Sequence, residues 1–427
     1  MRGSIPGSSP GTRMTFKRGC GCNDPMLDLL QGIRVISFNH FLLGPMGIQA
    51  LADLGADVIA VEPTDGAWQR HWSSGDIWHD GQGMLHICSN RNKRSIALDL
   101  KMPKGKEIAL KLIASADVVA ENFRPGVMDK LGLGYDALRR NKPALIYASA
   151  SGYGPDGPYA QRPGQDLLAQ ALFGLMAITG QPETGPRPVG VSVVDHHGAA
   201  LFAMGILAAL VRRERTGKGC RVDASLLQAA LDLQAESLTA WLNAPKRPAS
   251  ESSRRHLGGW YYPAPYGIYA TRDGHMAISL SSLQALADPL GEPHLASFSE
   301  RDAWTRQDEI GELIARRLKM ESTAEWSRRL EQARIWHARV QGYEEVVEDA
   351  QVRHVEMLVT VPGGGKTSAP ITLVNHPVRY DGEAASIRLP PPSLGRQTEE
   401  ILGELGFGTG EIRALIREGV VRAAETS

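Results

Sequence analysis

The chain has 427 residues, of which 42% are hydrophobic and 22% are charged, as in ordinary soluble globular proteins. Its 47 basic and 47 acidic residues cancel, so no bulk charge favours a nucleic acid or an anionic membrane as partner. No apolar run reaches the roughly 18 residues that a membrane span needs. At about 150 residues per domain, the length predicts two or three domains.

The N-terminal region and the cysteines indicate a cytoplasmic protein. Residues 1–25 are rich in Gly, Ser, Pro and Arg and lack the apolar segment of a signal peptide, so we expect a disordered leader. Cys20 and Cys22 lack the spacing and the second ligand pair of a zinc site. The chain's four cysteines fit a reducing compartment.

From residue 26 onward, predicted strands and helices alternate. Runs rich in β-branched and apolar residues predict strands at 32–38, 56–62, 93–100, 117–122 and 144–149. The segments between them predict helices at 46–54, 103–115 and 127–140. This alternation is typical of an α/β fold with a doubly wound, Rossmann-like sheet, whose ligands bind at the carboxyl ends of the strands.

One carboxylate, Asp195, stands out by its position. The valines of residues 188–194 predict a short buried strand, and residues 199–213 predict a buried helix. Asp195 lies between the two. From position alone it is either the N-cap of the helix or a nucleophile or base presented at a strand-to-helix junction. In both cases the helix N-terminus favours the ionised carboxylate.

The second half of the chain predicts a smaller α+β region. Helical sequence over 224–242 leads into 243–259, which loses apolar content and is typical of a linker or loop. Further elements are expected near 266–269, 275–280, 297–333, 357–380 and 401–421.

Two glycine motifs imitate nucleotide-binding loops. Residues 152–157 (GYGPDG) match G-x-G-x-x-G, but Pro155 and Pro158 block the helix that a dinucleotide fingerprint must open. Residues 363–367 (GGGKT) resemble a phosphate loop, but Thr360 occupies the place of its first glycine. We expect a turn at the first motif and a hairpin tip at the second.

Six segments form a larger pattern by their order and spacing. They are GIRVISF at 32–38, LGADVIAVE at 54–62, NRNKRSIALDLK at 90–101, ADVVAENFRPG at 116–126, the block around Asp195, and SLGRQTEEILGELG at 393–406. In this pattern the chain resembles the family III CoA-transferases, which include formyl-CoA transferase, carnitine CoA-transferase and α-methylacyl-CoA racemase. The resemblance extends from about residue 29 to about residue 421.

The resemblance implies that Asp195 is a nucleophile. In the transferases, an aspartate at this position attacks the acyl-CoA thioester, and the CoA thiolate then converts the mixed anhydride into an aspartyl-CoA thioester. Coenzyme A is thus a substrate carried on the protein, and neither a permanently bound cofactor nor a metal is expected. The partners implied are an acyl-CoA and a small carboxylic acid.

The resemblance also implies a set of CoA-binding residues, namely Leu98, Lys101, Asn122, Phe123, Arg124 and Lys130. Leu98 is equally well explained as a core strand residue. Lys93 and Arg94 have the charge to pair with phosphates, although an exposed basic pair is the common alternative. His40 lies in the first βα loop, where the family position favours the active site over a structural role.

The chain departs from the formyl-CoA transferase pattern at two polar positions. Leu42 replaces a glutamine, and Pro63 replaces an arginine, which puts the oxalate/formate substrate pair in doubt. The glycine-rich loop that covers the aspartyl intermediate is reduced to Gly258 and Gly259, which are candidate lid hinges or part of a plain linker turn.

Two other functions remain as alternatives. A racemase needs a base on each side of the α-carbon, and here Gln165 replaces the family's histidine beside Asp166, while His196 and His197 are not known positions for that role. Asp166 itself is expected to orient substrate or to cap the helix that follows it. The second alternative is a non-catalytic CoA-binding protein with the same fold.

The resemblance also implies a domain plan. It comprises the leader at 1–25, a large CoA-binding α/β domain at 26–225, a linker helix and loop at 226–259, a small α+β domain at 260–350, and a C-terminal segment at 351–427 that returns to the large domain. Family members form interlocked homodimers. The aromatic residues Trp68, Trp72, Trp260, Tyr261, Tyr262 and Tyr266 lead to the hypothesis that the acceptor acid is larger than formate.

Overall fold

The computed structural model describes residues 27–181, 184–245, 256, 258–365 and 367–424. The predicted leader at 1–25 therefore lies outside the described residues, as do Cys20 and Cys22.

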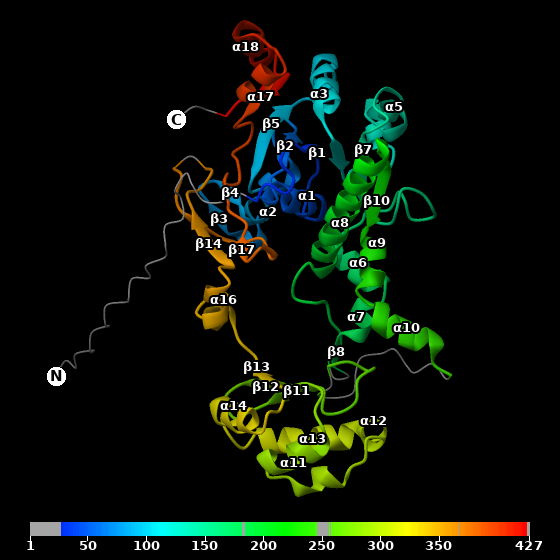
Figure 1. The fold of residues 1–427 in the computed structure, drawn as a ribbon, viewed down its shortest axis with the longest axis vertical. Helices are drawn as coiled ribbons and strands as arrows, with labels where there is room; N and C mark the ends of the chain where they lie inside the picture. The colour runs from blue at the N-terminus through cyan, green and yellow to red at the C-terminus, as the bar shows by residue number, and fades with distance from the viewer. Residues whose placement is uncertain (1–26, 182–183, 246–255, 257, 366, 425–427) are drawn as a thin grey trace, which may run out of the picture.

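A seven-stranded sheet organises the larger part of the chain (Figure 1). Six of its strands are parallel, namely β1 (Arg34–Phe38), β2 (Asp57–Glu62), β5 (Lys93–Leu98), β6 (Val118–Glu121), β7 (Ile146–Ser151) and β10 (Arg221–Ser225). Across the sheet they follow the order β10-β7-β6-β1-β2-β5, and the antiparallel β18 (Val421–Arg422) closes the edge beside β5. Starting from β5, the parallel strands are the third, second, first, fourth, fifth and sixth in the chain, which is the doubly wound order.

Helices cover both faces of this sheet, as the alternating pattern predicted. One face carries α3 (Pro103–Ser115), α4 (Val127–Leu131), α5 (Tyr135–Asn141), α17 (Thr398–Glu404) and α18 (Thr409–Arg417). The other face carries α1 (Leu43–Asp53), α6 (Asp166–Leu172), α8 (Val193–Thr216) and α9 (Leu226–Asp232). The inner parallel strands are buried between two apolar clusters and are largely hydrophobic, whereas the edge strand β10 has the polar sequence RVDAS and is partly exposed.

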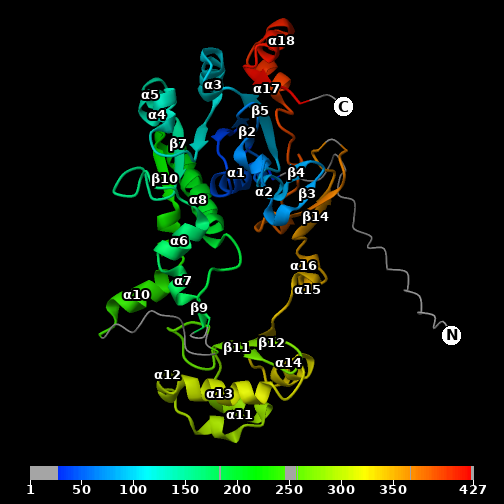
Figure 2. The same ribbon diagram turned by 180° about the vertical axis from the view of Figure 1, so that it is seen from behind.

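A second, smaller core lies at one end of the molecule (Figures 1 and 2). The three-stranded sheet β11 (Gly267–Ala270), β12 (His275–Ile278) and β13 (His337–Arg339) packs with α11 (Leu283–Leu290), α12 (Asp302–Thr305), α13 (Gln307–Leu318) and α14 (Thr323–Gln332). The chain reaches this core after α10 (Ala235–Asn243) and leaves it through α15 (Tyr343–Val346) and α16 (Ala350–His354) on the other side (Figure 2).

The C-terminal segment returns to the large sheet. A hairpin of β14 (Leu358–Val361) and β15 (Ile371–Val374) carries the motif 363–367 near its tip, as predicted. A second short pair, β16 (Arg379–Tyr380) and β17 (Glu383–Ala384), follows. Helices α17 and α18 then bring β18 beside β5.

The strand predicted at 188–194 is wrong. Residues 188–192 form no strand, Val191 is 52% exposed, and α8 already begins at Val193, six residues before the predicted start. The sheet offers no place for such a strand, because β10 pairs with β7 and forms that edge. Although α8 is long and apolar enough to span a membrane by composition, its inner face packs on the sheet as a core helix of this domain.

The helix predicted at 127–140 is interrupted. It forms α4 and α5, because Gly132 ends α4 with a left-handed backbone at φ 70°. The motif at 152–157 lies in irregular turns after β7, as the two prolines predicted.

Candidate active site

The strand order places a ligand crevice between the loops that follow β1 and β6. The order reverses between these two strands, and doubly wound proteins bind ligands at that point of the carboxyl edge. The side-chain amide of Asn122, after β6, accepts a hydrogen bond from the backbone N–H of His40 and donates one to its carbonyl oxygen, both at 2.8 Å. Two loops that are distant in sequence are thereby joined at the expected site.

The His40 side chain is part of this junction. Its ring lies 5.3 Å from that of Phe41 and 5.2 Å from that of Phe123, measured between ring centroids. Burial lowers the pKa of His40, so the imidazole is neutral at physiological pH. A neutral ring can accept or donate a hydrogen bond to a ligand without adding charge.

The first turn of α1 leads directly to Asp195. Leu42 is buried at the N-terminal boundary of α1. The Leu43 side chain packs closely on α8, since an added Cβ at Gly198 would lie 2.6 Å from Leu43 Cδ1. The backbone N–H of Leu43 lies near the Asp195 carboxylate and lowers the pKa of that group.

Asp195 occupies the first turn of α8, and Asp166 caps that turn. Ser192 holds the N-cap position, so the N-cap interpretation of Asp195 is wrong. The buried Asp166, at the start of α6, accepts hydrogen bonds at Oδ1 from the backbone N–H groups of Val194 at 2.7 Å and Asp195 at 3.1 Å. Asp166 thus caps α8 and not the helix that follows it in sequence, because it lies within α6 and Gln165 holds the N-cap position there without a side-chain hydrogen bond.

The surroundings of Asp195 disfavour its charge. Burial, and then the negative charge of Asp166, raise the pKa of Asp195 to about 7 from an ordinary value of 3.8, against the opposing effect of the Leu43 N–H. Burial and Asp166 thus oppose the preference for the ionised form that a helix N-terminus provides. A carboxylate of raised pKa in a ligand crevice is typical of functional sites.

The predicted CoA-binding residues lie at the same edge of the sheet. Lys101 follows β5, and Asn122, Phe123 and Arg124 follow β6, with Lys101 and Arg124 exposed. Lys130 is exposed in α4. The structure thus brings three cations to the carboxyl edge. Arg124 also lines a polar cavity of about 310 Å³, together with Glu121, Ser149, Arg221 and other residues.

Leu98 differs from the other predicted CoA-binding residues. Its side chain is 1% exposed and packs in the core, and its backbone pairs with Val421 of β18. The alternative interpretation of a core strand residue explains this side chain completely.

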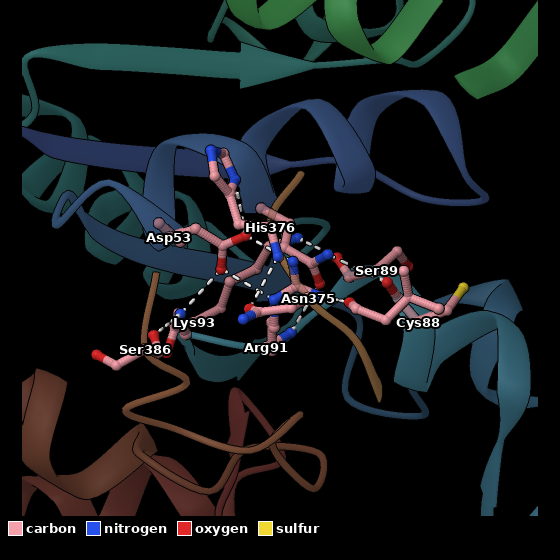
Figure 3. Close-up of polar contacts among 12 residues, drawn as sticks. Asp53, Cys88, Ser89, Arg91, Lys93, Asn375, His376 and Ser386 are labelled. Atoms are coloured by element: carbon pink, nitrogen blue, oxygen red, sulfur yellow. Dashed lines mark hydrogen bonds and ion pairs between the residues drawn. The ribbon is translucent and has the colours of Figure 1, made fainter. Parts of the chain in front are cut away.

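Lys93 and Arg94 do not face a ligand. Both lie at the amino end of β5, opposite the crevice. The buried Lys93 ammonium donates hydrogen bonds to the carbonyl oxygens of Pro45 and Ser89, within the polar cluster of Figure 3. Arg94 forms ion pairs with Asp57, Glu400 and Glu404. The suggested phosphate contacts are wrong because these partners already occupy both side chains.

The two candidate hinge glycines belong to another part of the chain. The N–H of Gly258 donates to the carbonyl oxygen of Tyr266 at 3.0 Å, and a Cβ at Gly258 would lie 2.6 Å from the Tyr266 ring. Gly259 packs similarly close to Tyr261. Both therefore pack on the segment before β11, whereas Asp195 lies on α8, which packs on the large sheet.

The sequence reasoning missed Gln170 of α6. This side chain is 1% exposed and contacts both Asp166 and the loop before α8. A glutamine four residues after an aspartate on one helix is a known stabilising pair, so the spacing of Asp166 and Gln170 was an available signal.

The fold and the site define a class of enzyme, and the comparisons name its family. A half-buried carboxylate at the switch point of a doubly wound sheet is suited to nucleophilic chemistry on a bound substrate. The chain belongs to CoA-transferase family III, whose model matches residues 30–398. The resemblance seen in the sequence is thereby confirmed.

Relatives with assigned activities support the same family. The chain is 33% identical to the mouse (Mus musculus) succinyl-CoA:glutarate CoA-transferase, over 98% of this chain and 97% of that protein. It is 37% identical to the acetyl-CoA:oxalate CoA-transferase of Acetobacter aceti, over 69% of this chain and 76% of that protein. Among solved structures, a CaiB/BaiF family protein from Brucella suis matches with a TM-score of 0.76 and 30% identity, over 89% of this chain and all of that one.

Proposed function

We propose that this family III CoA-transferase moves CoA from an acyl-CoA donor to a carboxylic acid acceptor through a covalent thioester on Asp195. One observation carries the proposal: Asp195 lies in the first turn of α8, next to Leu43 at the start of α1, and α1 follows β1 at the strand-order reversal, where substrates of this fold bind. The names of the relatives describe transfer between acyl-CoA and carboxylate substrates.

The proposed reaction has four displacements. The Asp195 carboxylate attacks the thioester carbonyl of the donor, and CoA leaves as a thiolate from the resulting mixed anhydride. The thiolate attacks the aspartyl carbonyl and expels the donor carboxylate, which leaves an aspartyl-CoA thioester. The acceptor carboxylate attacks this thioester and releases the thiolate again. The thiolate then attacks the acceptor carbonyl, which yields acceptor-CoA and the free Asp195 carboxylate.

The exposed cations at the crevice provide the proposed CoA site. Lys101, Arg124 and Lys130 can balance the phosphate charges of CoA. The neutral His40 ring and Asn122, which holds the His40 backbone, lie between these cations and the first turn of α1. CoA enters as a substrate in this proposal, with no permanently bound cofactor.

An exposed aromatic row supports an acceptor larger than formate. Phe41, beside His40, stacks on Trp68 with ring centroids 4.3 Å apart, and Trp68 stacks on Trp72 at 5.6 Å. All three rings are more than a third exposed. Because Leu42 adds no polar group here, an acid with an apolar body suits this surface better than formate does.

We also propose that the protein works as a homodimer in the cytoplasm. Helices α6 and α8 expose the apolar side chains of Leu167, Leu172, Met204 and Val211. Exposed apolar faces of this kind mark protein–protein interfaces, and a second copy is the partner that the family resemblance implies.

The adduct on Asp195 provides the direct test. Incubation with an acyl-CoA should give a hydroxylamine-sensitive CoA adduct that peptide mass spectrometry locates on Asp195. Asp195→Ala should lose both the adduct and CoA exchange while keeping its circular dichroism spectrum. Exchange of the α-proton in deuterated water without an acceptor would instead indicate a racemase. Binding of acyl-CoA with neither signal would indicate a non-catalytic protein and overturn the proposal.

A panel of acceptor acids of graded size tests the aromatic row separately. We expect transfer to larger acids with an apolar body. Activity with one- and two-carbon acids alone would contradict this part of the proposal.

A further inference from the structure

Gln170 makes contacts that connect α6 with the start of α8. Its Nε2 donates a hydrogen bond to Asp166 Oδ2 at 2.6 Å, and its Oε1 accepts one from the backbone N–H of Val189 at 2.9 Å. A longer contact of 3.5 Å joins Nε2 to the carbonyl oxygen of Val191. These partners determine the orientation of the amide, because the Val189 N–H requires an acceptor and the carboxylate requires a donor.

These contacts extend to the nucleophile through Asp166. One oxygen of Asp166 accepts the Gln170 amide, and the other accepts the N–H groups of Val194 and Asp195. The carboxylate therefore cannot rotate without losing a hydrogen bond on one side. Gln170 consequently determines the position of Asp166, and Asp166 holds the turn that presents Asp195.

We propose that Gln170 is a positioning residue for the transfer reaction: its amide orients Asp166 and the loop before α8, and thereby places the Asp195 carboxylate for attack. This inference rests on the proposed function of Asp195. Gln170 touches no substrate in this scheme and acts through Asp166 and the loop before α8. Its hydrogen bond to a carboxylate is of the stronger, charge-assisted kind.

Few titratable groups face Gln170 and Asp166. On α8 they are Asp195 and His196, since both interact electrostatically with Asp166. His197 of α8 pairs with Asp232, which is the only titratable residue in the sequence of α9. The sequences of α7 (Leu175–Ile178) and of residues 188–192 contain none.

The change Gln170→Glu tests the donor role. A glutamate keeps the size and the acceptor for Val189, but it can donate to Asp166 only when protonated. Two carboxylates at this distance share one proton, so the new carboxyl group should keep its proton to a higher pH than an ordinary glutamate does and lose it within the range of the assay. The ratio of the rate of aspartyl-CoA formation in Gln170→Glu to the rate in wild type should then be near one at low pH. It should fall roughly 10- to 100-fold as the pH rises, the range for loss of a hydrogen bond to a charged group.

Two further variants separate positioning from folding. Gln170→Leu has no donor and should lose a similar factor at every pH. Gln234→Glu is the matched control, because Gln234 is also buried but donates to the carbonyl oxygens of Phe173 and Ala230 instead of to a carboxylate. At temperatures where all variants remain folded by circular dichroism, the control should keep its activity ratio to wild type across the pH range.

Hydrogen exchange provides a readout that does not require activity. The N–H groups of Val194 and Asp195 should exchange faster in Gln170→Leu than in wild type at equal pH. In Gln170→Glu the same groups should exchange faster than in wild type only at high pH. If the Gln170 variants show this faster exchange but the wild type transfers no CoA, the positioning role is supported and the transfer function is refuted. A pH-independent activity ratio for Gln170→Glu together with wild-type exchange would overturn the inference.

Discussion

The raised pKa of Asp195 predicts the pH dependence of the reaction. With a pKa of about 7, the carboxyl group is ionised to about one-tenth at pH 6, one-half at pH 7 and nine-tenths at pH 8. The proposed attack requires the ionised form. The kcat/KM for the acyl-CoA donor, which reports the free enzyme, should therefore rise about tenfold from pH 6 to pH 8 and then level off. An aspartate with its ordinary value of 3.8 would give a flat profile over this range.

Asp166→Asn shows whether the neighbouring charge contributes to that pKa. The variant removes a negative charge that raises the pKa of Asp195, so the midpoint should move to lower pH. The shift should be partial, because burial is the larger cause and remains. Asp232→Asn, at the pair with His197, serves as the control and should leave the midpoint in place. Flat profiles from pH 6 to pH 8 in a folded, active wild type would refute the reasoning about Asp195.

Three further predictions concern stability and substrate size. Burial raises the pKa of Glu121 to about 7 from an ordinary 4.5, so its proton stabilises the folded state and native stability should fall between about pH 4.5 and pH 7. By pH 8 the wild type should have lost about 3 kcal/mol of unfolding free energy through this group, and Glu121→Gln should not show that loss. Urea unfolding at several pH values measures both. Asp53→Ala leaves Arg91 buried without its ion pair and should cost about 3–5 kcal/mol. Asp136→Ala, at the exposed pair with Arg139, should cost about 1 kcal/mol or less, and equal losses in urea unfolding would contradict this. Trp68→Ala should raise the KM of large apolar acceptors more than that of formate, and an equal change for both would argue against the aromatic row as the acceptor surface.

Five strands of the large sheet could be predicted because they carry their own signal. Strands buried on both faces appear as β-branched and apolar runs, and helices with caps and turns separate them. The strands β10 and β18 were missed, because β10 has the polar sequence RVDAS and β18 has only two residues. The alternation placed His40 in the first βα loop, and the structure puts this loop at the reversal between β1 and β6. Local patterns were sufficient wherever an element is stabilised by burial of its own apolar residues.

The surroundings of Asp195 could not be predicted in the same way. The valines before it have the composition of a strand, but the sheet edge is already taken by β10, so tertiary structure overrides the local preference. The cap of α8 comes from Asp166, 29 residues earlier in the chain. Lys93 has the charge of a phosphate ligand, but it is buried under α1 by partners that no local pattern indicates.

The arrangement around Asp195 reconciles two demands of the proposed exchange. A nucleophilic carboxylate becomes more reactive as its basicity rises, yet it must still be ionised at working pH. A pKa of about 7 satisfies both conditions at slightly alkaline pH, where the Asp195 carboxyl group is ionised in most molecules. The N–H of Leu43 favours the charged form, while burial and Asp166 raise the basicity. The basicity of Asp195 therefore depends in part on the negative charge of Asp166, and the Gln170 amide holds Asp166 in place by donating to its Oδ2.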